Sequence, residues 1–292
     1  MIITNSPTDT INLFNRNIYI KRDDLLHKDF TGNKARKFHY FLENEFPNID
    51  TIVSFGSNQS NAMYSLSVLA KLKNWNFKYF INHLPSYLKE HPSGNHKYAL
   101  LNGMELFVDE DFKTTQYEPK PNELFIEEGG AISEASFGIE KLVNEIKEWR
   151  CENNIQNLKI FLPSGTGTTA LFLQTFLDDK VFTTPCVGDS EYLLYQFSLL
   201  QKDSSLYPII LKPKKKYHFG KLYSEHFTLW NEIQMSTNIE FDLLYDPIGW
   251  STLEEHLEKF DGCEILYIHQ GGVLGNETMR ERYLRKSSIG KE

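Results

Sequence analysis

Lys34 follows Gly32 and Asn33 at the expected start of a helix. A cation at this end opposes the helix macrodipole, so a lysine that only faces water is disfavoured there. The same placement lowers the pKa of the amine, and a neutral lysine amine is a nucleophile that forms Schiff bases with carbonyl compounds. The alternative is an exposed lysine at a frayed helix start, and the neighbouring Arg36 and Lys37 could equally be solvated charges.

A loop rich in glycine and threonine follows the expected strand 158–162 and opens the next helix. It reads Gly165-Thr166-Gly167-Thr168-Thr169. Small residues let the backbone approach a ligand closely, and the free N–H groups at a helix start favour an anion. With its hydroxyl donors, the loop suits a phosphate monoester. It is neither a P-loop nor a complete G-x-G-x-x-G motif, so a tight turn without a ligand is the alternative.

A third polar loop, residues 56–61, lies between an expected strand and an expected helix. It contains the uncharged donors Asn58, Gln59, Ser60 and Asn61. Together with the amides at a helix start, such donors can hold a carboxylate without neutralising it. Ser60 and Asn61 are also good helix N-caps, and the two roles can coexist.

The elements that position these loops alternate between strands and helices. Apolar runs predict strands at 17–20, 51–55, 77–81, 105–108, 158–162, 181–182, 209–211, 241–245 and 264–268. Helical spacing predicts helices at 34–45, 61–73, 95–102, 133–150, 168–177, 191–200 and 253–260, and a last helix from residue 277. This order predicts an α/β fold with largely parallel sheets, helices on both faces and ligands beyond the carboxyl ends of the strands.

Composition excludes several classes of protein. The net charge of −8 gives no basic surface for nucleic acid, and no stretch approaches the length of a membrane-spanning helix. The start lacks the features of a signal peptide. Cys151, Cys186 and Cys263 are scattered, without disulfide or metal spacing, and core packing is expected for each. We expect a cytoplasmic protein without a metal site, and a solvated loop at the lysine-rich run 212–216.

Two segments together resemble a known signature. Ile20-Lys21-Arg22-Asp23-Asp24-Leu25, followed by Thr31-Gly32-Asn33-Lys34-Ala35-Arg36-Lys37, is similar to the 1-aminocyclopropane-1-carboxylate (ACC) deaminase and D-cysteine desulfhydrase family. That family is one of the tryptophan-synthase β-like (fold-type II) pyridoxal-phosphate enzymes. Further similar segments follow in order along nearly the whole chain, at 59–61, 128–130, 165–169 and 268–272.

The resemblance implies two layered α/β domains. The larger would comprise residues 1–43 and 135–292, the smaller residues 44–134, and pyridoxal 5'-phosphate would lie between them. The implied activity is that of a deaminase or lyase, which releases ammonia and a 2-oxo acid from a small amino acid such as D-cysteine or ACC. A homodimer is expected, and neither nucleic acid nor a membrane is expected as a partner.

The resemblance also implies roles for single residues. Lys34 would carry the cofactor as a Schiff base and move protons at the substrate α-carbon. Asn61 would bind the cofactor's phenolic oxygen, and the loop Gly165, Thr166, Gly167, Thr168 and Thr169 would hold its phosphate. Asn58, Gln59 and Ser60 would bind the substrate carboxylate. Ser60 is also a candidate catalytic nucleophile or proton donor.

This chain departs from the family pattern at two places. Ala62 stands where the family has His or Gln. The family's Asp-Pro-Val-Tyr, followed by Glu or Thr, aligns with Asp246-Pro247-Ile248-Gly249-Trp250. Gly249 would then replace an active-site tyrosine, and Trp250 would face the pyridine nitrogen. We therefore expect a substrate with an α-hydrogen and a β leaving group, such as D-cysteine, in preference to ACC.

Other classes of function compete with this reading. A β-replacement enzyme or an amino-acid racemase would share the fold. A degenerate protein could bind the cofactor or an amino acid without turnover. A nicotinamide dehydrogenase fits poorly, because the 165–169 loop lies in mid-chain and no clear acidic residue follows about 20 residues later.

Overall fold

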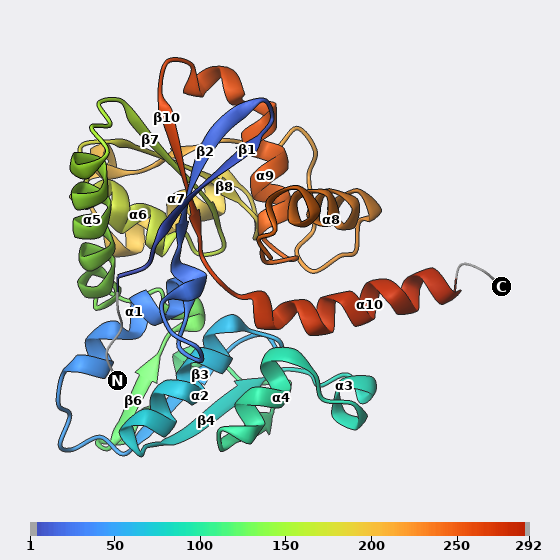
Figure 1. Cartoon of the computed structure of the whole chain (residues 1–292). Helices are drawn as coiled ribbons and strands as arrows, with labels where there is room; N and C mark the ends of the chain where they lie inside the picture. Colours follow the sequence, from blue (N-terminus) through green and yellow to red (C-terminus); the bar gives the residue numbers. More distant parts are fainter. Residues whose placement is uncertain (1–4, 290–292) are drawn as a thin grey trace.

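The computed structural model describes residues 5–289, which form two sheets that lie one above the other in Figure 1. The larger sheet has the order β1-β2-β10-β7-β8-β9. Its strands are β1 (Thr8–Leu13), β2 (Arg16–Arg22), β7 (Leu158–Ser164), β8 (Lys180–Pro185), β9 (Ile209–Ile210) and β10 (Glu264–His269). Only the β1–β2 pair is antiparallel. The central strands β7 and β10 are buried almost throughout, as expected for parallel strands that are covered on both faces, whereas β1 at the edge of the sheet is mostly polar.

Helices cover both faces of the large sheet. α5 (Ala135–Glu152) and α6 (Thr168–Phe176) pack on one face, and α8 (Ser224–Thr237) and α9 (Asp246–Glu255) pack on the other. α7 (Ser190–Leu200) packs against α6 through Leu193 and Phe197.

The smaller sheet is fully parallel, with the order β5-β4-β3-β6. Its strands are β3 (Thr51–Phe55), β4 (Asn76–Ile81), β5 (Met104–Val108) and β6 (Glu123–Ile126). Its helices are α1 (Gly32–Glu43), α2 (Asn61–Lys73) and α4 (Gly94–Leu101), which share one core with the strands, and the short α3 (Ser86–Glu90). Alternate residues of β4 point to opposite faces, so Phe77 and Tyr79 join this core while Phe80 stacks on Phe112 at 4.4 Å.

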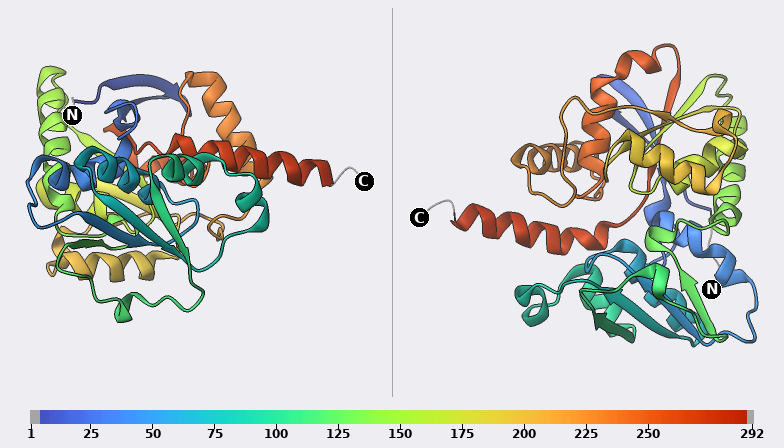
Figure 2. Two further views of the ribbon diagram at one scale, coloured as in Figure 1. Left: turned by 90° about the horizontal axis from the view of Figure 1, so that it is seen from below. Right: turned by 180° about the vertical axis from the view of Figure 1, so that it is seen from behind.

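α10 (Asn276–Ile289) runs between the two sheets, as Figure 1 and the right view of Figure 2 show, and then projects past the body of the molecule. Its buried Met279 and Tyr283 belong to the core of the large sheet. The helix therefore lies at the boundary between the two halves of the fold.

The predicted fold class is confirmed: parallel sheets with helices on both faces. The domain limits 44–134 stay a prediction, while the strands of the small sheet span residues 51–126. The sequence patterns missed β1, β6, α3 and α8, and the helix expected at 253–260 begins earlier, as α9 at Asp246. Within the described residues, no helix is both long and apolar enough to cross a bilayer.

The strand expected at 241–245 is wrong. The Asp242 carboxylate accepts hydrogen bonds from the backbone N–H groups of Leu244 at 2.7 Å and Tyr245 at 2.6 Å, so the chain turns here and enters α9. Core packing of the cysteines is correct for Cys186 but wrong for Cys151, which is exposed at the end of α5. The lysine run 212–216 is a surface loop, as expected.

Candidate active site

A cavity of about 650 Å³ lies between the two sheets, where the loops that follow their strands meet. Ten residues that the sequence predicted for the site line it: Lys34, Asn58, Gln59, Ser60, Asn61, Gly165, Thr166, Gly167, Thr168 and Thr169. These residues belong to three loops, and more than 100 positions of the chain separate the first loop from the last. Their convergence follows from the parallel sheets, whose carboxyl ends face one another across the cavity.

Lys34 lies in the first turn of α1, which is clamped to the end of β10. The Asn33 backbone N–H donates to the Gln270 carbonyl at 2.9 Å, and the Asn33 side chain donates to Gln270 Oε1 at 3.0 Å. Gly32 has a φ of 68°, and a Cβ there would lie 2.0 Å from the same carbonyl, so only glycine fits. Burial lowers the pKa of Lys34 to about 8, although nearby Asp242 favours the charged form. A substantial fraction of this amine is neutral near physiological pH.

The suggestion that Arg36 and Lys37 are solvated is wrong, because both are buried. Arg36 pairs with Asp23 at 2.8 Å and with Glu145 at 2.6 Å. This network ties α1 to α5, and its ion pairs offset the cost of burying the charges.

Lys37 lies one helical turn after Lys34, so helical spacing could have placed both amines on one face. Lys37 Nζ donates to the Gly129 carbonyl at 3.0 Å and lies 3.5 Å from Thr166 Oγ1. Burial lowers the pKa of Lys37 well below its usual range, and Lys34 lowers it further. A bound anion would stabilise its charged form. Lys37 is therefore a candidate for binding an anion, which the sequence did not predict.

The loop 165–169 has the features of an anion cradle. Gly167 has a φ of 72° and is the N-cap of α6. The first N–H groups of that helix therefore have no partner within the helix and lie at this loop. A Cβ on Gly167 would lie 2.4 Å from the Phe197 ring, so glycine is also required at this position for the turn itself. The hydroxyl of Thr169 is buried without a hydrogen-bond partner, which is costly unless a ligand or water occupies the site.

The loop 56–61 holds the other wall. Ser60 caps α2, because its Oγ accepts from the N–H groups of Ala62 at 3.1 Å and Met63 at 3.4 Å. Asn61 Oδ1 accepts from Asn95 at 2.6 Å, and its amide group bonds Asp242. Gln59 Nε2 is buried without a partner, so one donor remains available to a ligand.

The expectation for Gly249 and Trp250 is wrong. Trp250 is 1% exposed and stacks on Tyr267 with ring centroids 3.9 Å apart, away from the cavity. A Cβ on Gly249 would lie 2.8 Å from the Tyr267 hydroxyl, so a tyrosine would not fit at that position. Neither residue lines the cavity.

Tyr245 and Asp246 line the cavity instead. The segment Asp242-Leu243-Leu244-Tyr245-Asp246 has the spacing of the family's Asp-Pro-Val-Tyr followed by Glu or Thr. The alignment that begins at Asp246-Pro247 is therefore offset by four residues from the segment that lines the cavity. Burial raises the pKa of Tyr245, so its hydroxyl stays protonated.

The cavity floor carries two buried carboxyl groups. Burial raises the pKa of Asp242 to about 6, despite the N–H bonds of Tyr245 and Leu244. Burial raises the pKa of Asp246 well above its usual range, and Asp242 raises it further. Asp246 accepts from Tyr267 at 2.5 Å, so a bound cation or N–H donor would find an oriented carboxyl group here.

Comparison with solved structures defines the class of fold. The crystal structure of an ACC deaminase homologue superposes with a TM-score of 0.80 at 21% identity, over 97% of this chain and 94% of the other. The predicted tryptophan-synthase β-like fold is thereby confirmed. No protein-family model matches the chain.

Curated relatives match most of the chain. A proposed ACC deaminase from Thermotoga maritima is 24% identical, over 89% of this chain and 89% of its own. A mitochondrial bifunctional D-cysteine desulfhydrase/ACC deaminase from Arabidopsis thaliana is 24% identical, over 88% of this chain and 73% of its own. The chain therefore resembles these proteins over nearly its full length, as the motifs predicted.

Proposed function

We propose that this protein is a pyridoxal-phosphate-dependent deaminase or lyase that acts on a small amino acid and releases ammonia and a 2-oxo acid. One observation carries the proposal. The half-buried amine of Lys34 faces the same cavity as an anion cradle made of residues 165–169 and Lys37. An amine and a phosphate site in one enclosed cavity are the features that hold this cofactor.

The residues present fit the cofactor. The orphaned Thr169 hydroxyl, the start of α6 and Lys37 would hold the phosphate, and Lys34 would hold the aldehyde carbon. Asn61 has one amide hydrogen left for the phenolic oxygen, because the other is used by Asp242. Asp246 would pair with the ring nitrogen. When bound, the cofactor supplies an electron sink for the electron pair left at the substrate α-carbon.

The other residues bind substrate and move protons. With a pKa of about 8, Lys34 can take and return the proton at the α-carbon. The lone pairs of Ser60 Oγ are engaged by two N–H groups, so Ser60 would donate to the substrate carboxylate rather than attack as a nucleophile. Gln59 and Asn58 would complete the carboxylate site. The protonated Tyr245 hydroxyl would donate a proton to the leaving group.

Two substrates deserve direct comparison, because the names of the relatives include both reactions. D-Cysteine has an α-hydrogen and a β leaving group, whereas ACC has no α-hydrogen. The sequence-based argument against ACC rested on a missing tyrosine. Tyr245 at the cavity removes that argument. We still propose D-cysteine as the preferred substrate and ACC as the second, because Lys34 can act on the α-hydrogen that only D-cysteine carries.

The test begins with the purified protein and added pyridoxal phosphate. We expect a yellow protein that borohydride bleaches, with the pyridoxyl label on Lys34 in a mass-spectrometric peptide map. Lys34→Ala should lose the label, whereas Lys37→Met should keep it at Lys34 but need more cofactor. A label on Lys37 in the unmodified protein would contradict the assignment.

Turnover separates an enzyme from a binding protein of the same fold. Ammonia and 2-oxo acid release should be measured with D-cysteine, L-cysteine and ACC. A labelled protein that releases no ammonia from any of them would favour the degenerate binding protein. Racemisation of the α-carbon without release of ammonia would favour a racemase. Loss of the β leaving group only in the presence of an added nucleophile would favour β-replacement.

We also propose a cytoplasmic location and a homodimer. Three free cysteines support a reducing compartment. Light scattering on the eluting protein would test the dimer, and cell fractionation would test the location.

A further inference from the structure

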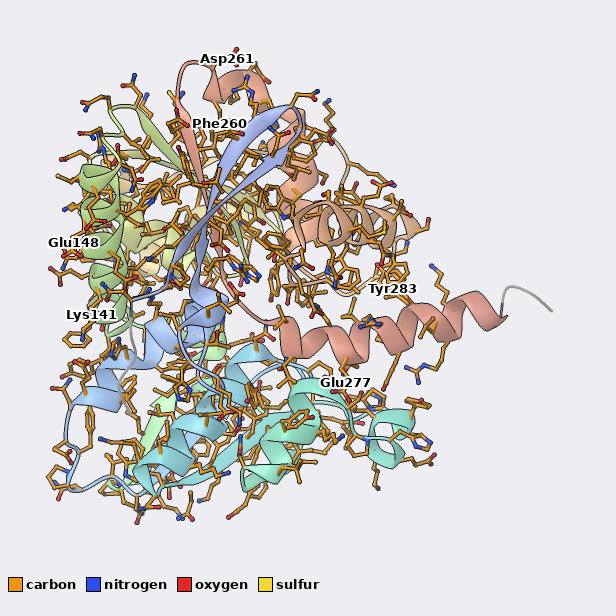
Figure 3. The ribbon with its side chains drawn as sticks, in the orientation of Figure 1. Lys141, Glu148, Phe260, Asp261, Glu277 and Tyr283 are labelled. Carbon is orange, nitrogen blue, oxygen red and sulfur yellow. The ribbon has the colours of Figure 1, made fainter. Side chains whose placement is uncertain are left out.

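The C-terminal helix α10 forms one wall of the cavity. Thr278 Oγ1 donates to Gln59 Oε1 at 3.2 Å, so the first turn of α10 lies beside the loop proposed to bind the substrate carboxylate. Tyr283 points from α10 toward the large domain, where its hydroxyl donates to the Tyr223 carbonyl at 3.1 Å (Figure 3). These contacts hold the helix in place and fix which side chains face the cavity.

Arg282 lies one turn after Thr278 and faces the cavity. Its Nη2 donates to the Gly220 carbonyl at 2.7 Å, on the loop whose Phe219 lies 5.4 Å from the Tyr245 ring. Arg282 therefore lies next to the loop that packs on Tyr245, and Phe219 of this loop is 41% exposed.

The guanidinium of Arg282 is half-buried, and burial lowers its pKa. Among the described side chains, no carboxylate forms an ion pair with Arg282 or with Arg285, which also lines the cavity and lies over the Tyr87 ring at 3.6 Å. The nearby Glu281 carboxylate instead accepts from Ser93 at 3.0 Å. The second terminal nitrogen of Arg282, Nη1, donates to Met279 Sδ at 3.2 Å, so both partners of this guanidinium are neutral. An anionic ligand would supply a charged partner and a stronger hydrogen bond.

We infer that Arg282, assisted by Arg285, is a specificity-determining site for a second anionic group at the far end of the substrate side chain. The inference rests on the proposed function and deepens it. Besides D-cysteine, the substrate class would then include β-substituted alanines whose leaving group carries a carboxylate or a similar anion. Arg's planar set of donors suits such a group in two-point contact.

S-Carboxymethylcysteine and its amide, S-carbamoylmethylcysteine, test this inference, because they differ in charge but hardly in size. Elimination breaks the Cβ–S bond, the sulfur leaves as a thiol after gaining a proton, and water converts the remaining fragment to pyruvate and ammonia. One water is consumed for each substrate. Both enantiomers of each compound should be assayed with the cofactor-loaded enzyme.

The unmodified enzyme should prefer the carboxylate over the amide by about tenfold or more in kcat/KM, as expected for a charge-assisted hydrogen bond. Arg282→Gln should remove the preference, and Arg285→Gln should reduce it. Arg280→Gln is the matched control, because Arg280 is exposed on the same helix and does not line the cavity. General damage to the fold would slow both substrates equally and leave their ratio unchanged.

Binding gives a second readout that does not need turnover. Calorimetry should show tighter binding of adipate than of its monoamide to the unmodified protein, and equal binding to Arg282→Gln. If neither cysteine derivative reacts but this difference is present, the anion site stands and the proposed reaction falls. Equal binding of the two probes to the unmodified protein, or a preference that survives Arg282→Gln, would overturn the inference.

Discussion

The Thr169→Val substitution should raise the stability of the cofactor-free protein while it weakens cofactor binding. Thr169 is 4% exposed and its hydroxyl has no hydrogen-bond partner. A buried hydroxyl without a partner costs about 1–3 kcal/mol, and valine has nearly the same shape without that group. The melting temperature of the apoprotein should therefore rise, by about 2–4 °C for each kcal/mol gained.

The effect on cofactor affinity should have the opposite sign. A hydrogen bond to a charged phosphate contributes about 1.5–3 kcal/mol, so its loss should weaken pyridoxal-phosphate binding by about 10- to 150-fold. Fluorescence titration of the apoprotein measures this dissociation constant, and calorimetry measures the melting temperature.

Thr175→Val on the same helix is the control. The Thr175 hydroxyl donates to the Leu171 carbonyl at 2.9 Å and does not line the cavity, so cofactor affinity should stay within about twofold. A Thr169→Val protein with unchanged affinity for pyridoxal phosphate and a higher melting temperature would contradict a phosphate-binding role of the loop 165–169. It would support a turn with a structural role only.

Three further perturbations test the frame of the site. Because the pKa of Lys34 is lowered to about 8, the rate of cofactor capture by the apoprotein should rise with pH and level off above that value; a flat profile from pH 6 to 9, by stopped-flow absorbance, would contradict this. Gly32→Ala should destabilise by about 2–4 kcal/mol in urea titration, because its Cβ would meet the Gln270 carbonyl, whereas Gly262→Ala, with a similar φ but open space, should cost about 1–2 kcal/mol. Arg36→Met should cost about 3–5 kcal/mol, since Asp23 and Glu145 would stay buried without their partner, and a loss below 1 kcal/mol would show that this network is dispensable.

Local sequence was sufficient for the loops and for the class of fold. Gly32, Gly165 and Gly167 mark backbone turns, and the apolar runs beside them mark buried parallel strands. Both signals act over a few residues, because they depend on backbone conformation and on side-chain periodicity. In each parallel sheet such loops share one edge, which was predictable. That the edges of the two sheets meet at a single cavity was decided by the tertiary structure.

Only the tertiary structure decided which charges are buried and which residues close the cavity. Lys37 and Arg36 look like surface charges in the sequence, but Gly129 and Glu145, far along the chain, bury them. The strand expected at 241–245 is absent because the Asp242 side chain turns the chain, and Tyr245 therefore lies at the start of α9, beside the cavity. The place of Arg282 follows from α10, which contacts Gln59 beside the small sheet and Gly220 on the side of the large sheet. Burial and orientation of this kind arise from contacts between distant segments, and no short-range pattern in a sequence records them.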